Sequence, residues 1–134
     1  MKTAWRVCAA AVLAFAMWSS SALGQIPVGN HYLCHKTRDV KVPAKFVSQT
    51  GVPIVDQVGN FSCDVKKPFL LCNPAQKNGS PIVDANLHYC CYKVKCTPNK
   101  IPTQFDVTDQ YGPLRLETGK AFHLCNPCSK VPAS

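Results

Sequence analysis

The chain has little charge, few acidic residues and, beyond its first 24 residues, no tryptophan or methionine. Charged residues make up only 16% of the 134 residues, against 46% hydrophobic ones, and this balance argues against an intrinsically disordered chain. With 9 cysteines and 11 prolines, a helical bundle is not expected either. No segment after residue 24 is apolar enough to span a membrane. The sequence also lacks the motifs of serine hydrolases, zinc proteases, phosphate-binding loops and dinucleotide-binding folds.

The first 24 residues are typical of a secretory signal peptide. Lys2 and Arg6 precede an apolar run of 12 residues from Val7 to Trp18, and small residues then lead to an expected cleavage before Gln25. The run is too short to cross a bilayer, which takes about 20 residues, and an uncleaved anchor is the alternative. We therefore predict a secreted, periplasmic or cell-envelope protein with no transmembrane span in its mature form. Its mature chain has 13 basic and 7 acidic residues, a net charge of +6.

Loss of Cys8 with the signal leaves eight cysteines. An even number in an exported chain predicts disulfides rather than free thiols or metal ligands. Without tryptophan or methionine, the core must use Val, Ile, Leu, Phe and Tyr, with cross-links compensating for a small buried area. We expect no cofactor and no metal; zinc held by a set such as His88, Cys90, Cys91 and Cys96 is the alternative that the composition leaves open.

An internal repeat is the most informative feature of the sequence. Residues 56–77 align without a gap on residues 109–130 with ten identities, where about one or two would arise by chance. Upstream, H-Y-L-C-H-K at 31–36 matches H-Y-C-C-Y-K at 88–93. Each copy therefore reads H-Y-x-C-x-K, a spacer, D-Q-x-G, a hydrophobic stretch and L-C-N-P. The predicted organisation is a signal peptide at 1–24, a first repeat at 25–87 and a second repeat at 88–134.

Both copies have the pattern of short β-strands. Runs rich in β-branched and aromatic residues, bounded by Gly, Pro, Asn or Asp, predict strands at 32–38, 52–58, 61–65 and 69–72, and at 89–96, 103–108, 114–118 and 122–125. The D-Q-x-G tetrapeptide has the residue preferences of a type I turn. We predict an all-β fold in which two pseudo-symmetric repeats, of about four short strands each, pack as one disulfide-stapled sandwich or barrel.

These motifs resemble the repeat of an uncharacterised family of exported bacterial proteins, a domain of unknown function that often occurs in tandem. The likeness is carried by H-Y-x-C-[HY]-K, D-Q-[VY]-G, K-x-F and L-C-N-P-x-x-K, and it covers about Asn30 to Lys130. The first copy departs from the family pattern at His35 and Val58, where the family usually has an aromatic residue. The resemblance implies export and a β-rich repeat fold, and it brings no catalytic residues.

The repeat restricts the pairing of the cysteines. Cys34 and Cys72 occupy the positions in the first copy that Cys91 and Cys125 occupy in the second, which favours one disulfide inside each copy. The remaining four cysteines have no counterpart, and we expect Cys96–Cys128 and Cys63–Cys90. The main alternative exchanges partners between copies, as Cys34–Cys125 and Cys72–Cys91.

The excess of basic residues is the one remaining functional signal. Lysine and arginine recur at strand spacing after the first motif of each copy, so that each pair is expected to project from one face. The candidate binding residues are Lys36, Arg38, Lys93, Lys95, Tyr89 and Tyr92. Such a surface suits a polyanion such as an acidic polysaccharide or an envelope phosphate, rather than nucleic acid. The alternative is an edge strand that its lysines protect from pairing with other chains.

The sequence gives no reason to assign a catalytic residue. We therefore predict a secreted, non-enzymatic binding or surface-structural protein whose oligomeric state is open. The alternatives are a small exported hydrolase using His123, a redox helper using the C-x-x-C pair Cys125 and Cys128, and a hydrolase inhibitor acting through the loop at 73–84.

Overall fold

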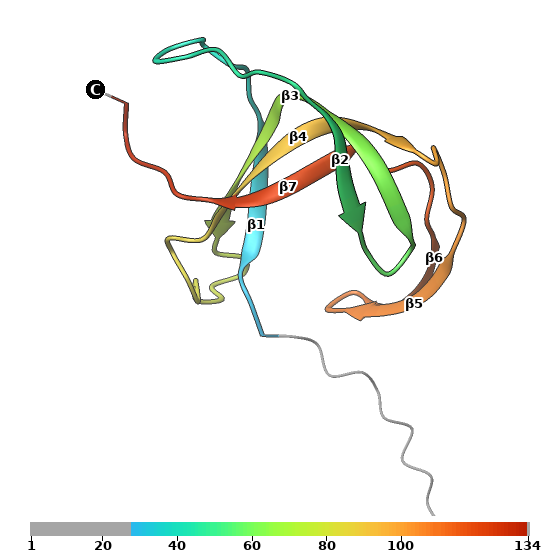
Figure 1. The fold of residues 1–134 in the computed structure, drawn as a ribbon. Coiled ribbons are helices and arrows are strands. Elements are labelled where there is room, and N and C mark those ends of the chain that lie inside the picture. The colour runs from blue at the N-terminus through green and yellow to red at the C-terminus, as the bar shows by residue number, and fades with distance from the viewer. Residues whose placement is uncertain (1–27, 134) are drawn as a thin grey trace, which may run out of the picture.

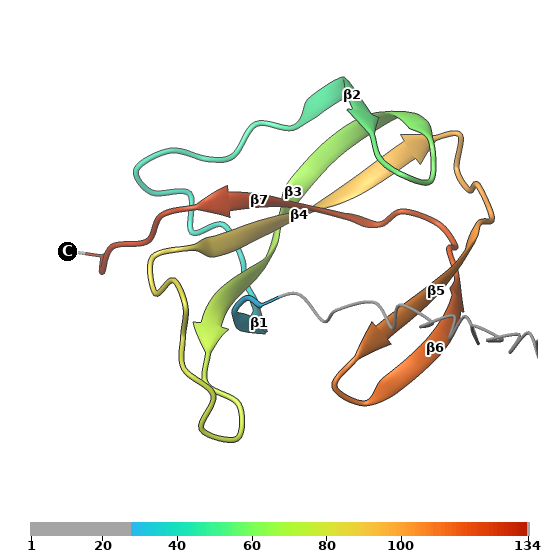
Figure 2. The same ribbon diagram turned by 90° about the horizontal axis from the view of Figure 1, so that it is seen from below.

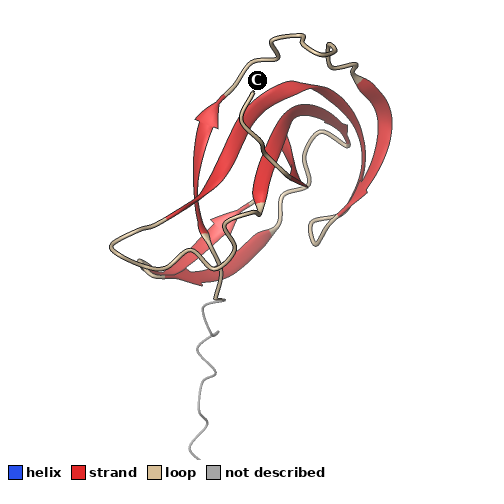
Figure 3. Ribbon diagram, turned by 90° about the vertical axis from the view of Figure 1, so that its left-hand side faces the viewer, coloured by secondary structure: helices blue, strands red, loops and turns tan. Residues whose placement is uncertain are grey.

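The structure, a computed structural model, describes residues 28–133, and the predicted signal peptide lies outside them. Every regular element of this part of the chain is a β-strand, as Figure 3 shows, so the predicted all-β class is confirmed. The elements are β1 (His31–Lys36), β2 (Gln49–Val55), β3 (Asn60–Ala75), β4 (His88–Thr97), β5 (Gln104–Asp109), β6 (Gly112–Glu117) and β7 (His123–Cys128). Within residues 28–133 there is no helix that is long and apolar enough to cross a membrane.

Five strands form one antiparallel sheet in the order β1-β3-β4-β7, with β2 beside the first part of β3. Strands β5 and β6 pair only with each other, and Figures 1 and 2 show this hairpin standing apart from the large sheet. Of the predicted sandwich or barrel, the barrel is therefore wrong. A barrel would need its two end strands to pair, and here β1 and β7 lie at opposite ends of the strand order.

Seven strands replace the expected eight because β3 is continuous. The predicted stretches 61–65 and 69–72 are one strand of 16 residues, which pairs with β4 over most of its length. The register shifts between Val65 and Lys67 and again between Pro68 and Leu70. These irregularities accommodate a proline that a regular inner strand would exclude. The equivalent place in the second copy is the loop between β6 and β7.

The two D-Q-x-G tetrapeptides both form hairpin turns, which confirms their position as turns. Between β2 and β3, the Asp56 carboxylate accepts hydrogen bonds from the backbone N–H groups of Val58 and Gly59, at 2.8 and 3.1 Å. Between β5 and β6, the Asp109 carboxylate accepts one from the N–H of Tyr111 at 2.8 Å. Aspartate at the first position thus closes each turn through its side chain.

The outer strand pairs have matching registers. In β1 and β3, His31 lies opposite Ala75 and Cys34 opposite Cys72. In β4 and β7, the aligned residues His88 and Cys91 lie opposite Cys128 and Cys125. The sheet therefore holds two strand pairs of equal register side by side, β1–β3 and β4–β7, joined where β3 pairs with β4.

All eight cysteines of residues 28–133 form disulfides, and the two predicted within the copies, Cys34–Cys72 and Cys91–Cys125, are present. The other two predicted pairs, Cys96–Cys128 and Cys63–Cys90, are wrong. The structure joins Cys63 to Cys96 and Cys90 to Cys128. Strand register explains the difference, because Cys63 lies directly opposite Cys96 on β4, while Cys128 lies at the other end of β4, opposite His88.

The core is small and is built largely of sulfur. Six hydrophobic residues are buried: Cys63, Val65, Cys72, Cys91, Val94 and Cys96. Phenylalanine, isoleucine, leucine and tyrosine side chains are only partly buried around the cluster that Cys63, Val65, Val94 and Cys96 form. Half-cystines therefore occupy much of the interior that was expected to hold aliphatic and aromatic side chains. Four disulfides also indicate that the chain folds in an oxidising compartment.

Candidate functional site

The segment between β1 and β2, residues 37–48, is organised around Asp39. The Asp39 carboxylate accepts hydrogen bonds from the backbone N–H groups of Lys41 and Phe46, both at 2.8 Å. These two hydrogen bonds hold the pKa of Asp39 below its ordinary value, and the bond from Phe46 has the larger effect. The carboxylate is therefore ionised at neutral pH. Lys41 has a φ of 65°, a left-handed conformation that allows the chain to turn back toward the sheet. One acidic side chain thus fixes the shape of a loop rich in basic ones.

Two contacts hold this loop over the sheet. The Phe46 ring packs on Tyr92 of β4 with ring centroids 5.1 Å apart, and it contacts the buried cluster. The Ser48 hydroxyl donates a hydrogen bond of 2.7 Å to the carbonyl oxygen of Lys66 on β3. The loop is therefore anchored at its C-terminal end, where it leads into β2.

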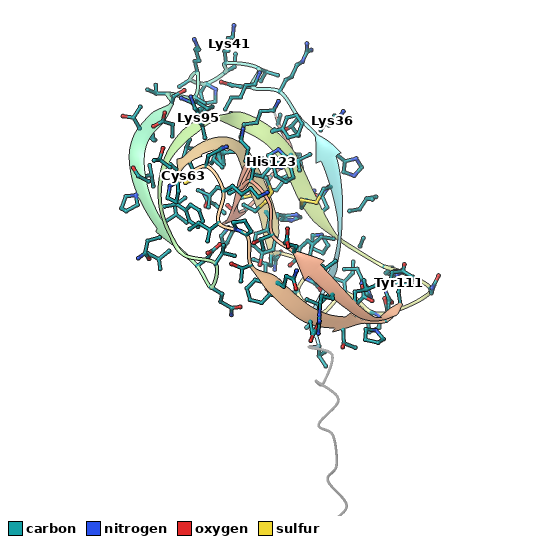
Figure 4. All side chains as sticks on the ribbon, turned by 90° about the vertical axis from the view of Figure 1, so that its right-hand side faces the viewer. Lys36, Lys41, Cys63, Lys95, Tyr111 and His123 are labelled. Carbon is teal, nitrogen blue, oxygen red and sulfur yellow. A yellow bond between two sulfur atoms is a disulfide. The ribbon has the colours of Figure 1, made fainter. Side chains whose placement is uncertain are left out.

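A hollow of about 440 Å³ lies between this loop and the exposed face of β3 and β4. We call it the basic hollow, because six of its twelve lining residues carry positive charge: Arg38, Lys41, Lys45, Lys66, Lys67 and Lys93. Asp39 is the only acidic residue in the lining. Figure 4 shows Lys41 at the opposite end of the molecule from Tyr111, which lies in the turn between β5 and β6.

Most of these cations have no acidic partner. Lys66 forms an ion pair with Asp64 at 2.9 Å, and this contact lowers the pKa of the Asp64 carboxyl. The one other ion pair within residues 28–133, Arg115 with Asp106, is on the separate hairpin. The Lys93 ammonium lies 4.4 Å from the centroid of the Phe69 ring. A cluster of unneutralised cations creates a positive potential that favours an anionic ligand.

The predicted binding residues do not all lie together. Arg38 and Lys93 line the basic hollow, whereas Lys36 and Lys95 do not. Lys93 and Lys95 do share the exposed face of β4, because they alternate with buried neighbours. Lys36 and Arg38 were also expected to project from one face of a strand. They do not, because β1 ends at Lys36 and Arg38 belongs to the loop.

The two predicted tyrosines lie in different places. Tyr92 lies beneath the loop as the partner of Phe46 and is not part of the lining. Tyr89 packs edge-on against Tyr32, with ring centroids 5.0 Å apart, near the start of β1 and β4.

Lys66 and Lys67 line the basic hollow but are not among the binding residues predicted from the sequence. They lie in the middle of β3, where the register shifts and where Lys67 stands opposite Lys93 of β4. The predicted strands end at residue 65 and begin again at residue 69, so both lysines lie between them. Their charge inside a hydrophobic stretch was the one signal that pointed to this place.

The residues of the alternative enzymatic hypotheses have other roles in the structure. Cys125 and Cys128 are not bonded to each other but to Cys91 and Cys90, so the C-x-x-C pair is not a redox disulfide here. His123 stacks on Phe69 with ring centroids 4.8 Å apart and contacts Phe122 at 4.3 Å.

The pKa of His123 is lowered mainly by burial of its ring and, to a smaller extent, by the positive charge of Lys93. The ring is therefore neutral at pH 7. In the part of the chain that the structure describes, no three His, Cys, Asp or Glu side chains converge as metal ligands.

Comparison of the chain with protein-family models, with curated protein sequences and with solved structures gives no match.

Proposed function

We propose that the chain is an exported, non-enzymatic binding protein, built from two copies of one β unit, that holds an anionic polymer in the basic hollow. The observation that supports this most directly is the lining, in which six cations surround a single carboxylate. That carboxylate supplies one negative charge against six positive ones, so the lining keeps a net positive charge. Bringing an anion into the hollow relieves the mutual repulsion of the cations.

The hollow also has an apolar part. Pro68, Phe69 and Phe46 lie among the basic side chains. A ligand with both anionic groups and apolar ring faces, such as an acidic polysaccharide of a cell surface, fits this combination better than a small inorganic anion.

The predicted export and the duplication of the chain also support the proposed function. The predicted signal peptide and the four disulfides fit a protein that works outside the cytoplasm. The equal registers of β1–β3 and β4–β7 fit two copies of one unit, as in the tandem-repeat family that the motifs resemble. The second copy has no equivalent of the long basic loop, since β4 continues to Thr97 where β1 ends at Lys36.

The test is a binding measurement with a sulfated polysaccharide (heparin) as probe and uncharged dextran as control. We expect the wild type to bind heparin with an affinity that falls as salt rises, and not to bind dextran. Two double variants, Lys41→Gln/Lys45→Gln and Lys67→Gln/Lys93→Gln, should bind several-fold more weakly. Their salt dependence should also be shallower, by up to about one unit of slope for each lysine that contacts the polymer.

The matched control removes the same amount of charge elsewhere. Lys100→Gln/Arg115→Gln changes the net charge equally but lies outside the basic hollow. An equal loss of heparin binding in this variant would show that overall charge, and not the hollow, attracts the polymer. Binding that is unchanged between low and moderate salt would contradict the proposal as a whole.

A further inference from the structure

The two halves of the chain meet along a seam between β3 and β4. In this seam Cys72 lies opposite Tyr89, and Leu71 opposite Cys90. The Sγ atom of Cys72 is 3.9 Å from that of Cys91, although the two belong to different disulfides. A strand of the first half thus pairs with a strand of the second half in a contact that excludes water.

A polar cluster secures one end of the seam. The Oδ1 atom of Asn73 lies 3.2 Å from Nδ1 of His88 and 3.0 Å from Nζ of Lys130. His88 is buried, so its ring needs this partner. The acceptor comes from the first half and both donors come from the second, so the cluster joins the halves to each other.

The chain repeats these same residues on its two outer edges. In the alignment of the copies, Asn126 is the equivalent of Asn73, His31 of His88 and Lys77 of Lys130. Asn126 lies on β7 and His31 begins β1, at opposite ends of the sheet order. Within residues 28–133, the Asn126 amide and the His31 ring make no side-chain hydrogen bond, and the Lys77 ammonium contacts the Tyr111 hydroxyl instead of an asparagine. The seam residues are therefore present twice but meet only once in a single molecule.

The backbone at both edges is also ready to pair. No strand of residues 28–133 pairs with the outer side of β1 or of β7. Cys34 and Cys72 have Cα atoms 3.9 Å apart, and so do Cys91 and Cys125, which is the spacing of non-hydrogen-bonded pairs. The N–H and C=O groups of Cys34 and Cys125 therefore point away from their partners and out of the sheet. In the seam, the same groups of Cys91 and Cys72 point toward each other's strands.

We propose that the protein assembles head to tail, with β7 of one molecule pairing with β1 of the next in the register of the internal seam. Cys125 then lies opposite Tyr32 of the next molecule, and Leu124 opposite its Leu33. Asn126 accepts hydrogen bonds from His31 and Lys77 of that molecule, as Asn73 does from His88 and Lys130, and Lys77 leaves the Tyr111 hydroxyl that it contacts in the single molecule. Leu33, which is 59% exposed in the single molecule, is covered by the contact.

Lysines at the edges do not prevent this pairing. The same register places Lys120 opposite Lys36 of the next molecule, and the internal seam already holds the equivalent pair, Lys67 opposite Lys93. Because the two joined edges are different, the contact is heterologous and leaves one free edge at each end of the assembly. A short seam of this kind gives weak association in dilute solution, of the type in which a strand adds to a sheet edge.

The test uses one variant for each edge. Leu33→Lys places a charge in the middle of the β1 edge, and Asn126→Lys places a cation against His31 and Lys77 of the neighbour. Molecular mass is measured by sedimentation between about 10 µM and about 1 mM chain. We expect the mass of the wild type to rise with concentration through successive multiples of the chain. Each variant alone should associate at least about tenfold more weakly, the effect of losing a central contact of an interface.

A mixture of the two variants gives the sharpest result. Leu33→Lys keeps an intact β7 edge and Asn126→Lys keeps an intact β1 edge, so an equal mixture should form one-to-one dimers that grow no further. The controls are Val55→Lys and Asn99→Lys, which replace an exposed aliphatic residue and an exposed asparagine by lysine away from β1 and β7 and should assemble like the wild type.

Three results would overturn the proposal: a wild type that stays monomeric up to the highest concentration, edge variants that associate like the wild type, or a mixture that does not dimerise. A titration that finds no free thiol in each variant shows that its disulfides, and hence its fold, are intact. No polyanion is present in these measurements, so their outcome is independent of the proposed binding function.

Discussion

Cys63 on β3 lies directly opposite Cys96 on β4, and the disulfide between them is at the centre of the buried cluster. The two residues are only 1% and 4% exposed, and Figure 4 shows Cys63 inside the curve of the large sheet. The Cys90–Cys128 disulfide spans a similar length of chain, 38 residues against 33, but its cysteines are only partly buried. Comparing the two disulfides therefore separates the contribution of cross-linking to stability from the contribution of packing.

Replacing each pair by alanine should show that difference. Loss of either cross-link removes about 3 to 4 kcal/mol according to the chain-entropy relation. Cys63→Ala/Cys96→Ala should lose about 1 to 2 kcal/mol more than Cys90→Ala/Cys128→Ala, because it also leaves a cavity in the core. Urea unfolding of the two variants measures the difference. Equal losses would mean that the sulfur atoms of Cys63 and Cys96 contribute nothing by packing.

The disulfide pairing itself can be tested by proteolysis after lysine and arginine without reduction. The structure predicts three linked sets of peptides: the peptide ending at Lys36 with 67–77, 46–66 with 96–100, and 78–93 with 121–130. Pairing of Cys63 with Cys90 and of Cys96 with Cys128 would instead join four peptides into one product. Mass spectrometry distinguishes these patterns without any assumption about the fold.

The pKa of His123 should lie below the ordinary value of about 6.5. Burial disfavours the charged ring and Lys93 repels it, so the unfolded chain binds a proton more readily than the folded one. Stability from this residue is therefore present above about pH 6.5 and decreases as the pH falls toward the lower pKa of the folded state. Proton NMR titration of the ring gives the pKa directly. His123→Phe keeps the stacking on Phe69 and should make stability less dependent on pH between 7 and 5, and an unchanged dependence would contradict this assignment.

Asp39 should control the shape of the basic loop. Asp39→Ala removes the acceptor of the Lys41 and Phe46 N–H groups, so their hydrogen exchange should become faster. In the wild type the pKa of Asp39 is lowered, and the protection of these two amides should persist until the pH falls below the ordinary value of an aspartate. Asp84→Ala, which alters another exposed loop, is the control. Unchanged exchange at Phe46 in Asp39→Ala would show that the aromatic contact alone holds the loop.

Residues close together in the sequence were sufficient to predict most strands and both hairpin turns. The hairpin turns at Asp56 and Asp109 follow from side-chain chemistry within four residues. The two disulfides inside the copies follow from the repeat, because equivalent cysteines share equivalent places in the sheet. These features need no knowledge of how distant strands align.

The remaining disulfides and the basic hollow depend on register between distant strands. The partner of Cys63 depends on the register of β3 against β4, and the residues near Cys63 in the sequence do not specify that register. Lys66 and Lys67 face the loop only because β3 continues through them, which in turn requires β4 beside it. A strand break and a bulged continuous strand have the same sequence pattern when the partner strand is unknown.

A core made largely of half-cystines ties the acquisition of structure to sulfur chemistry. Before oxidation, residues 28–133 have only two buried aliphatic residues, Val65 and Val94, to hold their strands together. So small an apolar interior cannot offset the entropy of ordering more than a hundred residues. The reduced polypeptide should therefore remain unfolded, and it should become compact only when its thiols are oxidised.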